Sequence, residues 1–358
     1  MSLSIGIVGL PNVGKSTLFN SLTNNDILAA NYPFATIEPN TGIVAIPDHR
    51  LSALAKIYNN APIVPATVNF IDIAGLVSGA SKGEGLGNQF LGHIRSTDAI
   101  CHVVRAFDDS NVVHIEEEVN PEKDIEVINT ELMLADLQTI EKQLPKITKE
   151  AKGNPKLKPI VDTLERTQKL LNEGKPLYSV NDLDFDLIKD THLITVKPVI
   201  YLFNMDEKGL SDSSKKQQLR EIVAPAKAIF VCAQLENELK DLDSNDATEL
   251  LNSYGQEESG LAQLIHAAYD ALGLQSYLTA GEKEVRAWTV KKGTNAPKAA
   301  GVIHGDFEKG FIAAEVVSFD DLISAGSITG AKANGKVRLE GKNYIMQPDD
   351  IVDFRFNT

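Results

Sequence analysis

Gly9-Leu10-Pro11-Asn12-Val13-Gly14-Lys15-Ser16 is the stretch of sequence that decides the fold. It fits the pattern Gly-x4-Gly-Lys-Ser, in which backbone N–H groups wrap phosphates and the next helix turns its positive end toward them. An apolar run with the pattern of a buried strand, residues 3–8, precedes it, and a helical pattern with Leu18 and Leu22 on one face follows. The sequence therefore predicts strand, phosphate loop and helix in that order.

The residues of this loop have distinct expected roles. Gly14 allows the backbone to approach the ligand closely, Lys15 reaches the β- and γ-phosphates, and Ser16 holds Mg²⁺. The nucleotide-binding residues expected in this segment are Asn12, Val13, Gly14, Lys15, Ser16 and Thr17. A plain glycine turn is the competing interpretation, and the placement between a strand and a helix disfavours it.

Two further segments are expected to complete the magnesium and phosphate site. Asp72-Ile73-Ala74-Gly75 ends the next clear strand, so Asp72 should hold Mg²⁺ through water and the Gly75 N–H should meet the γ-phosphate. Thr36 lies between the two motifs in a turn-rich stretch, where a switch threonine would join the Mg²⁺ shell when a triphosphate is bound. An ordinary surface-loop threonine remains the alternative for Thr36.

The base-reading motif departs from the GTPase pattern. Asn204-Met205-Asp206-Glu207 follows the strand at 199–203, where a GTPase carries Asn-Lys-x-Asp. In that pattern the aspartate accepts two hydrogen bonds from guanine, whereas here the lysine is Met205 and the aspartate is the longer Glu207. Asn204 could pair with N6 and N7 of adenine instead. We therefore expect Asn204, Met205 and Glu207 to contact the base and ATP to be preferred, with GTP recognition by Glu207 left open.

The order of predicted elements indicates an α/β protein with additional parts. Apolar strands at 68–73, 99–104, 199–203 and 228–232 alternate with helical patterns, which argues for a mostly parallel sheet covered by helices. From about residue 277 the pattern changes to short strands with one helix, including a hairpin that turns at Gly341. The expected domains are 1–120 plus 191–276 for nucleotide binding, 121–190 as a helical insertion, and 277–358 as a small α+β domain.

The insertion has the pattern of two antiparallel helices. Leu137, Ile140, Leu144 and Ile147 form a seam, and the Gly153-Asn154-Pro155 break is followed by a second apolar series. Residues 137–175 contain nine Lys or Arg against five Asp or Glu, a local charge of +4. This surface is either a solvated helix face or an arm that touches RNA or another acidic partner.

Composition bounds the remaining possibilities. The net charge of −14 argues against binding nucleic acid through bulk electrostatics, so any RNA contact must use a local basic patch. Sequence-specific DNA is not an expected partner. No apolar run approaches the roughly 18 residues of a membrane span, and the N-terminus lacks a signal-peptide pattern. Cys101 and Cys232 lie in apolar stretches and are expected to be buried thiols. The cytoplasm is the expected compartment.

Together these motifs resemble one family. The phosphate loop, the 31–41 segment and Asp72–Leu76 resemble the Obg-related GTPases, and the altered 204–207 motif with Arg286–Val290 is similar to the YchF subfamily, the Obg-like ATPases. The resemblance covers essentially the whole chain. It implies a Ras-like P-loop domain, an inserted α-helical hairpin and a C-terminal β-grasp (TGS) domain. It also implies hydrolysis of ATP in preference to GTP and association with the ribosome.

The resemblance also bears on hydrolysis. Leu76 occupies the position where Ras-type enzymes carry a water-orienting glutamine, so slow intrinsic turnover is expected. The family histidine that matches His114 is proposed to be catalytic, beside Lys15 and Gly75, and Asn12 matches an asparagine that coordinates K⁺ in related GTPases. A solvated His114, an Asn12 bonded to local backbone, and a binding module that uses nucleotide as a structural switch remain alternatives. A metabolic kinase is disfavoured because no acceptor site is evident.

Overall fold

The computed structural model describes residues 3–23, 40–73, 86–107, 119–239 and 242–357. The chain forms two compact units, each with its own six-stranded sheet. One unit consists of Met1–Val44 with Asn69–Ala271, and the other of Ala45–Val68 with Leu272–Thr358. The phosphate-loop sequence and the C-terminal strands therefore fold around separate cores.

The first unit is built on a sheet with the order β2-β4-β1-β5-β6-β7. Its strands are β1 (Ser4–Val8), β2 (Thr41–Ala45), β4 (Thr67–Asp72), β5 (Ala99–Arg105), β6 (Val199–Asn204) and β7 (Lys227–Val231). The pairs β1–β4, β1–β5, β5–β6 and β6–β7 are parallel, and every residue of β1 and β5 is buried. Such fully buried strands are typical of a parallel sheet covered on both faces, which confirms the predicted α/β architecture.

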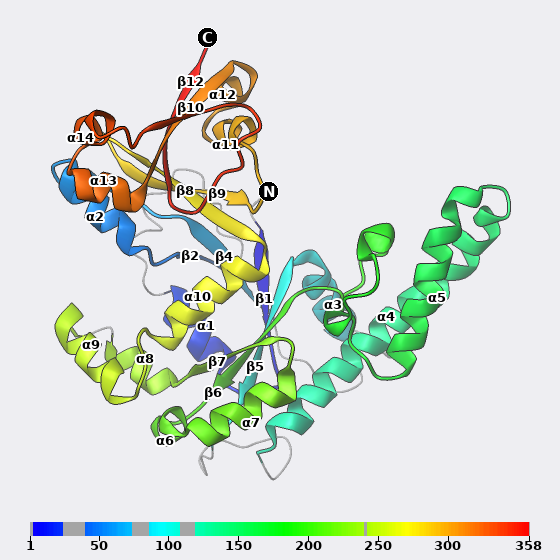
Figure 1. Cartoon of the computed structure of the whole chain (residues 1–358). Coiled ribbons are helices and arrows are strands. Elements are labelled where there is room, and N and C mark those ends of the chain that lie inside the picture. The colour runs from blue at the N-terminus through cyan, green and yellow to red at the C-terminus, as the bar shows by residue number, and fades with distance from the viewer. Residues whose placement is uncertain (1–2, 24–39, 74–85, 108–118, 240–241, 358) are drawn as a thin grey trace. The chain divides into compact units, whose positions relative to one another are not determined.

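Helices surround this sheet, as Figure 1 shows. They are α1 (Lys15–Thr23), α3 (Leu86–Ser96), α6 (Glu207–Ser211), α7 (Ser213–Val223), α8 (Ala233–Leu239), α9 (Ser244–Ser253) and α10 (Gly260–Ala271). The phosphate loop follows the carboxyl end of β1, and Asp72 and Asn204 are the last residues of β4 and β6, so these motifs lie at the carboxyl edge of the parallel strands. No helix in the described part of the chain is long and apolar enough to cross a membrane.

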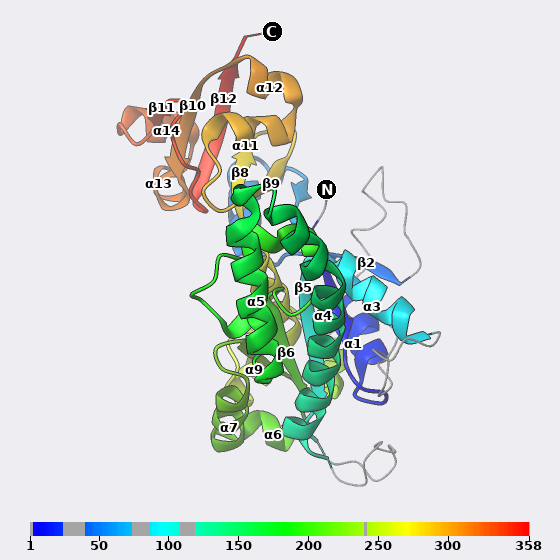
Figure 2. The ribbon, with the colours of Figure 1, turned by 90° about the vertical axis from the view of Figure 1, so that its right-hand side faces the viewer.

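The insertion is the predicted helical hairpin. It contains α4 (Pro121–Ala151), η3 (Pro155–Leu157), α5 (Lys158–Asn172), η4 (Leu177–Ser179) and η5 (Phe185–Thr191), with α4 and α5 side by side in Figure 2. The α4 helix begins with the Asn120 side chain accepting from the Lys123 N–H. Ile140 and Leu164 are fully buried in the cluster between the helices. The seam read from the sequence is therefore the helix interface.

The second unit has a mixed sheet with the order β11-β10-β12-β8-β9-β3. Its strands are β3 (Ile63–Val64), β8 (Leu274–Ala280), β9 (Val285–Lys291), β10 (Phe311–Ser318), β11 (Arg338–Glu340) and β12 (Asp350–Phe356). Its helices are α2 (His49–Ile57), α11 (Ala296–Ile303), α12 (Gly305–Lys309), α13 (Phe319–Ala325) and α14 (Ile328–Ala333). A core of α11 alanines with Tyr277, Val316 and Phe354 fills one face of the sheet. This arrangement is the expected β-grasp domain.

The division of the chain differs from the expected boundaries at residues 45–68. These residues were placed with the nucleotide-binding domain, but β3 pairs with β9 and α2 buries Leu51 and Leu54 in the second unit. Arg50 on α2 also donates to the carbonyl oxygen of Pro348 at 2.6 Å. The chain leaves the first unit after β2 and returns to it at β4. The strand that pairs with β3 in the second unit, β9, lies more than 200 residues later in the sequence. The helical insertion belongs to the first unit, and the C-terminal part of the second unit begins at Leu272.

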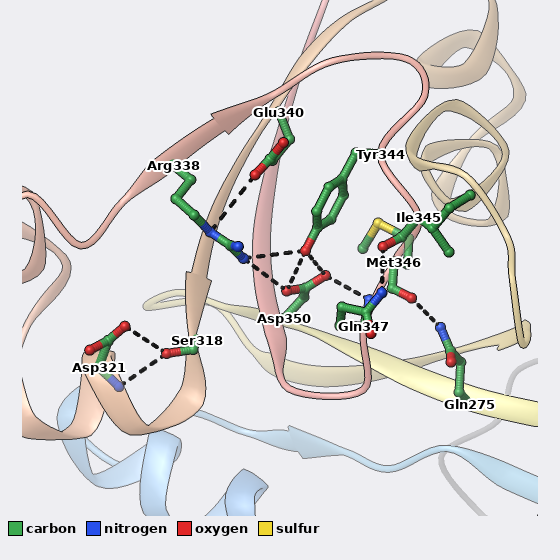
Figure 3. Close-up of polar contacts among 10 residues, drawn as sticks. All are labelled: Gln275, Ser318, Asp321, Arg338, Glu340, Tyr344, Ile345, Met346, Gln347 and Asp350. Atoms are coloured by element: carbon green, nitrogen blue, oxygen red, sulfur yellow. Dashed lines mark hydrogen bonds and ion pairs between the residues drawn. The ribbon is translucent and has the colours of Figure 1, made fainter.

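The hairpin predicted at Gly341 is wrong. Only β11 forms there, and it pairs with β10, whereas the chain after Gly341 makes a turn and a single bridge between Asn295 and Ile345. The phenol of Tyr344 donates to the buried carboxylate of Asp350 at 2.9 and 3.0 Å (Figure 3). Met346 is buried too. The contacts of Tyr344 and Met346 therefore hold the chain after Gly341 in a position where it does not pair with β11.

Candidate nucleotide-binding site

The phosphate loop joins β1 to α1 with a backbone that requires its glycines. A Cβ on Gly9 would lie 2.5 Å from the backbone oxygen of Val103. Gly14 has φ 96°, a left-handed value that favours glycine, and a Cβ there would lie 2.5 Å from Nδ2 of Asn204. Asn12 also adopts a left-handed conformation, with φ 62°. The loop is therefore closely packed against β5 and β6.

The side chain of Lys15 is folded over this loop. Lys15 is 8 % exposed, and its Nζ donates to the carbonyl oxygens of Gly9 and Leu10, both at 3.0 Å. Burial lowers the pKa of the Lys15 ammonium, and the nearby charge of Asp72 opposes that shift. Ser16 is exposed in the first turn of α1. The loop thus presents a buried cation and an accessible hydroxyl beside each other.

Asp72 lies at the end of β4, opposite Ile7 of β1. Its Oδ1 is buried and has no hydrogen-bond partner among the residues that the structure describes. Burial raises the pKa of the carboxyl group, and Lys15 lowers it. A buried carboxylate oxygen without a partner is costly unless an ion or a water satisfies it. Asp72 and Ser16 therefore carry oxygen atoms of the kind that Mg²⁺ prefers and could hold the ion.

Asn204, at the end of β6, is tied to the phosphate loop. Its Nδ2 donates to the carbonyl oxygen of Val13 at 3.1 Å, and the side chain is buried. The register places Asn204 between Arg105 on β5 and Val231 on β7. One amide donor of Asn204 is thus committed to Val13, which constrains how the side chain can meet a base.

The next residues separate into a core side chain and a surface carboxylate. Met205 is 2 % exposed and packs in the cluster that contains Phe203 and Leu210. Asp206 caps α6 by accepting from the Gly209 N–H at 2.8 Å. Glu207 is half-buried, and its Oε2 accepts a hydrogen bond from the phenol of Tyr254 at 2.9 Å. Met205, which stands where a GTPase has lysine, is therefore part of the core. Glu207 is held by the hydrogen bond from Tyr254 at the end of α9.

Sequence reasoning did not place Tyr254 or Cys232 at this edge, although it did predict Cys232 as a buried thiol. Cys232 directly follows β7 and is buried, and the charges of Glu207 and Asp206 add to burial in raising the pKa of its thiol. Because β6 and β7 are parallel neighbours, their carboxyl ends meet, which could have predicted Cys232. Tyr254 carries no motif that would have identified it.

Three predicted site residues lie outside the described residues. They are Thr36, Gly75 and His114, and Leu76 lies in the same part of the chain as Gly75. The structure brings together the phosphate loop, Asp72 and the 204–207 motif at the carboxyl ends of the parallel strands of one sheet. This fold and this loop define a P-loop nucleotide-binding protein.

The particular family follows from comparison with known proteins. The chain is 50% identical over 365 residues to the ribosome-binding ATPase YchF of Bacillus subtilis, and 51% identical to that of Pasteurella multocida, with 100% of each chain covered. It therefore belongs to the YchF family. The YchF GTPase of Schizosaccharomyces pombe, a solved structure, is 38% identical with a TM-score of 0.86, covering 99% of this chain and 98% of that one.

Two family models match separate parts of the chain. The model described as "50S ribosome-binding GTPase" matches residues 4–149. The C-terminal model of the YchF GTPases, described as "Protein of unknown function (DUF933)", matches residues 274–357. The relatives are named ATPases and the solved structure a GTPase, so the names of these proteins differ on the nucleotide.

Proposed function

We propose that this chain is a Mg²⁺-dependent P-loop ATPase that binds ATP in preference to GTP, hydrolyses it slowly, and acts as a switch on the ribosome in the cytoplasm. The observation that carries the proposal is the buried Oδ1 of Asp72, unpartnered among the described residues, close enough to Lys15 for their charges to interact. A cation and an oxygen donor in this arrangement fit a magnesium-bound triphosphate.

The residues of the loop would divide the work on the phosphates. Lys15 would give up its hydrogen bonds to the loop carbonyl oxygens and bind the β- and γ-phosphates instead. Backbone N–H groups from Asn12 to Thr17 would surround the phosphates. Ser16, Thr36 and Asp72 would hold Mg²⁺, which neutralises developing charge when bound. The N–H of Gly75 would meet the γ-phosphate. The basis for Thr36 and Gly75 is the sequence pattern alone.

Adenine preference rests on the altered base motif. Glu207 is one methylene longer than the aspartate that reads guanine, and Met205 is buried where that motif has a lysine. Asn204, Met205 and Glu207 would form the base side of the site. Isothermal titration with ADP and GDP tests this choice. Tighter binding of ADP supports it, and equal or tighter binding of GDP favours the second candidate, a GTPase in which Glu207 replaces the aspartate.

For hydrolysis, Lys15, Gly75 and His114 are the proposed catalytic groups, and Leu76 explains a low intrinsic rate. Replacing His114 by Ala should lower kcat and leave ATP affinity intact, whereas unchanged turnover would remove it from the mechanism. Asn12 is the proposed ligand of a K⁺ ion that would stand in for an arginine finger. Equal rates in NaCl and KCl would exclude that role.

Ribosome association is supported by the tip of the helical hairpin. All nine basic residues between 137 and 175 are exposed. Three of them form ion pairs, and the other six form none among the residues that the structure describes. These six are Lys169 and the five toward the tip: Lys142, Lys146, Lys149, Lys152 and Lys156. Unpaired cations on a projecting arm suit contact with RNA phosphates. Co-sedimentation with ribosomes in ATP, in ADP and without nucleotide tests this, and nucleotide-dependent binding without turnover would favour a non-catalytic binding module.

A further inference from the structure

The hydrogen bond between Tyr254 and Glu207 joins two parts of the first unit that are far apart in sequence. Tyr254 follows α9 as its C-cap, and Gly255 ends the helix with φ 65°. Its phenol reaches the Oε2 of Glu207, 47 positions earlier, at 2.9 Å. Glu207 is the first residue of α6, in the motif where a GTPase reads guanine.

The ring of Tyr254 is anchored next to the base motif. It packs, with Leu250, against the core cluster that contains Met205, Leu210 and Cys232. Met205 precedes Glu207 by only two residues. The same cluster therefore holds both the chain next to Glu207 and the Tyr254 ring whose phenol bonds the Glu207 carboxylate. The Tyr254 hydroxyl therefore has a defined direction, whereas a solvated tyrosine would not.

This bond limits what Glu207 can offer to a base. A carboxylate that reads guanine uses both oxygens in one plane, one for N1–H and one for the N2 amino group. In this structure the Tyr254 phenol occupies one lone pair of Oε2 and fixes the direction of that oxygen, whereas Oε1 accepts no hydrogen bond from the described residues and keeps both of its lone pairs. Adenine offers one donor on that edge, the N6 amino group, and one oxygen is enough to accept from it.

We infer that Tyr254 is a positioning residue that sets base preference, because it competes for Oε2 and fixes the Glu207 carboxylate, which favours the one hydrogen bond from adenine over the two from guanine. This inference rests on the proposed contact of Glu207 with the base. The bond to Glu207 also raises the pKa of the Tyr254 phenol, so the hydroxyl stays a donor at neutral pH. Hydrogen bonds to a charged group are among the stronger ones in proteins, so losing this one should be measurable.

The test measures the affinities of the full chain for ADP and GDP by titration calorimetry. Tyr254→Phe keeps the ring on the core and removes only the hydroxyl. It should raise GDP affinity relative to ADP affinity by about tenfold, a change of ~1.4 kcal/mol. Glu207→Asp breaks the same contact from the other side by shortening the carboxylate, and it should shift the ratio in the same direction.

A matched control is Tyr178→Phe. Tyr178 packs against the same core cluster, but its hydroxyl bonds that of Tyr201, at 2.9 Å, and not Glu207. This variant should leave the ratio unchanged. If Tyr254→Phe weakens ADP and GDP equally, or changes neither, Tyr254 has a structural role only and the inference is overturned.

A third variant separates this inference from the proposed function. Glu207→Ala should weaken ADP binding if Glu207 contacts the base. Unchanged ADP and GDP affinities in Glu207→Ala would contradict the base contact itself. Altered affinities in Glu207→Ala, combined with an unchanged ratio in Tyr254→Phe, would contradict only the role of Tyr254.

Discussion

The Nδ2 atom of Asn204 lies 3.1 Å from the carbonyl oxygen of Val13, so the end of β6 is bonded to the phosphate loop. This contact packs Asn204 so closely against Gly14 that a Cβ there would lie 2.5 Å from Nδ2. The base motif and the phosphate loop are therefore one structural unit. We therefore expect a substitution at Gly14 to disturb Asn204, and a substitution at Asn204 to remove one contact that holds the loop.

Replacing Gly14 by Ala should abolish nucleotide binding. The new methyl group would collide with Asn204, and φ 96° is a conformation that alanine rarely adopts. We expect ADP affinity to fall at least about 100-fold, since close contact with phosphate depends on this backbone. The control is Gly153→Ala at the tip of the hairpin, where the nearest atom would be at 3.7 Å. Near-normal binding by Gly14→Ala would contradict the packing described.

Replacing Asp72 by Asn should separate ligand binding from stability. Burial raises the carboxyl pKa more than Lys15 lowers it, so the ionised group is a net cost to the folded protein. The neutral amide should leave the thermal midpoint of the free protein unchanged or raised. The Mg²⁺ dependence of ATP binding should be lost. Calorimetry with and without Mg²⁺ measures the second effect, and a variant that still responds fully to Mg²⁺ would exclude Asp72 as its ligand.

His102 should make the first unit sensitive to acid. It lies on β5 opposite Val8, is buried, and its ring centroid lies 5.1 Å from that of Tyr201. Burial, and to a lesser extent the charge of Lys15, lowers its pKa from 6.5 to about 3. The unfolded chain takes up the proton first as pH falls, so stability should drop below pH 6.5, by about 2 kcal/mol at pH 5.

Denaturant unfolding between pH 5 and pH 8 measures this slope. His102→Phe should flatten it, because the buried titrating group is gone. His304→Asn is the control, since His304 is an exposed helix cap whose role asparagine can take over. An unchanged slope in His102→Phe would assign the acid sensitivity to other groups.

Reversing charge at the hairpin tip should weaken ribosome binding. Lys149 and Lys152 are exposed and form no ion pair among the described residues. Lys149→Glu with Lys152→Glu should lower co-sedimentation at physiological salt by about tenfold or more. Each lost lysine removes a contact with a phosphate and the affinity that counterion release contributes. The same double charge change at exposed Lys208 and Lys227 should have little effect. Equal losses in both variants would indicate a non-specific charge effect.

Much of the fold was predictable because its signals are local. The buried strands, the phosphate loop and the Ile140 seam of the hairpin depend on neighbouring residues, and the structure confirms them. The position of α2 was not predictable, because Leu51 and Leu54 show that a helix buries a face without showing against what. The hairpin expected at Gly341 was wrong for a related reason, since Met346 packs in the cluster that contains Tyr277, and its carbonyl oxygen accepts from Gln275, 71 residues earlier.

The candidate site divides in a similar way. Lys15 and Asp72 belong to recognisable motifs at the ends of two strands, so the sequence could predict that they lie close together. Their roles in binding nucleotide stay predictions. The contact between Tyr254 and Glu207 has no sequence signal, because it depends on how α9 packs on the core. The bond from Asn204 to Val13 was also unexpected, and it limits the adenine pairing imagined for that amide.

The most direct test of the central claim is the release of phosphate from ATP and from GTP by the full chain, in Mg²⁺ and K⁺, with and without ribosomes. The account predicts a larger kcat/KM for ATP than for GTP, a low rate for the protein alone, and no activity in Gly14→Ala. A kcat/KM that is equal or larger for GTP would contradict the assignment of this chain as an ATPase.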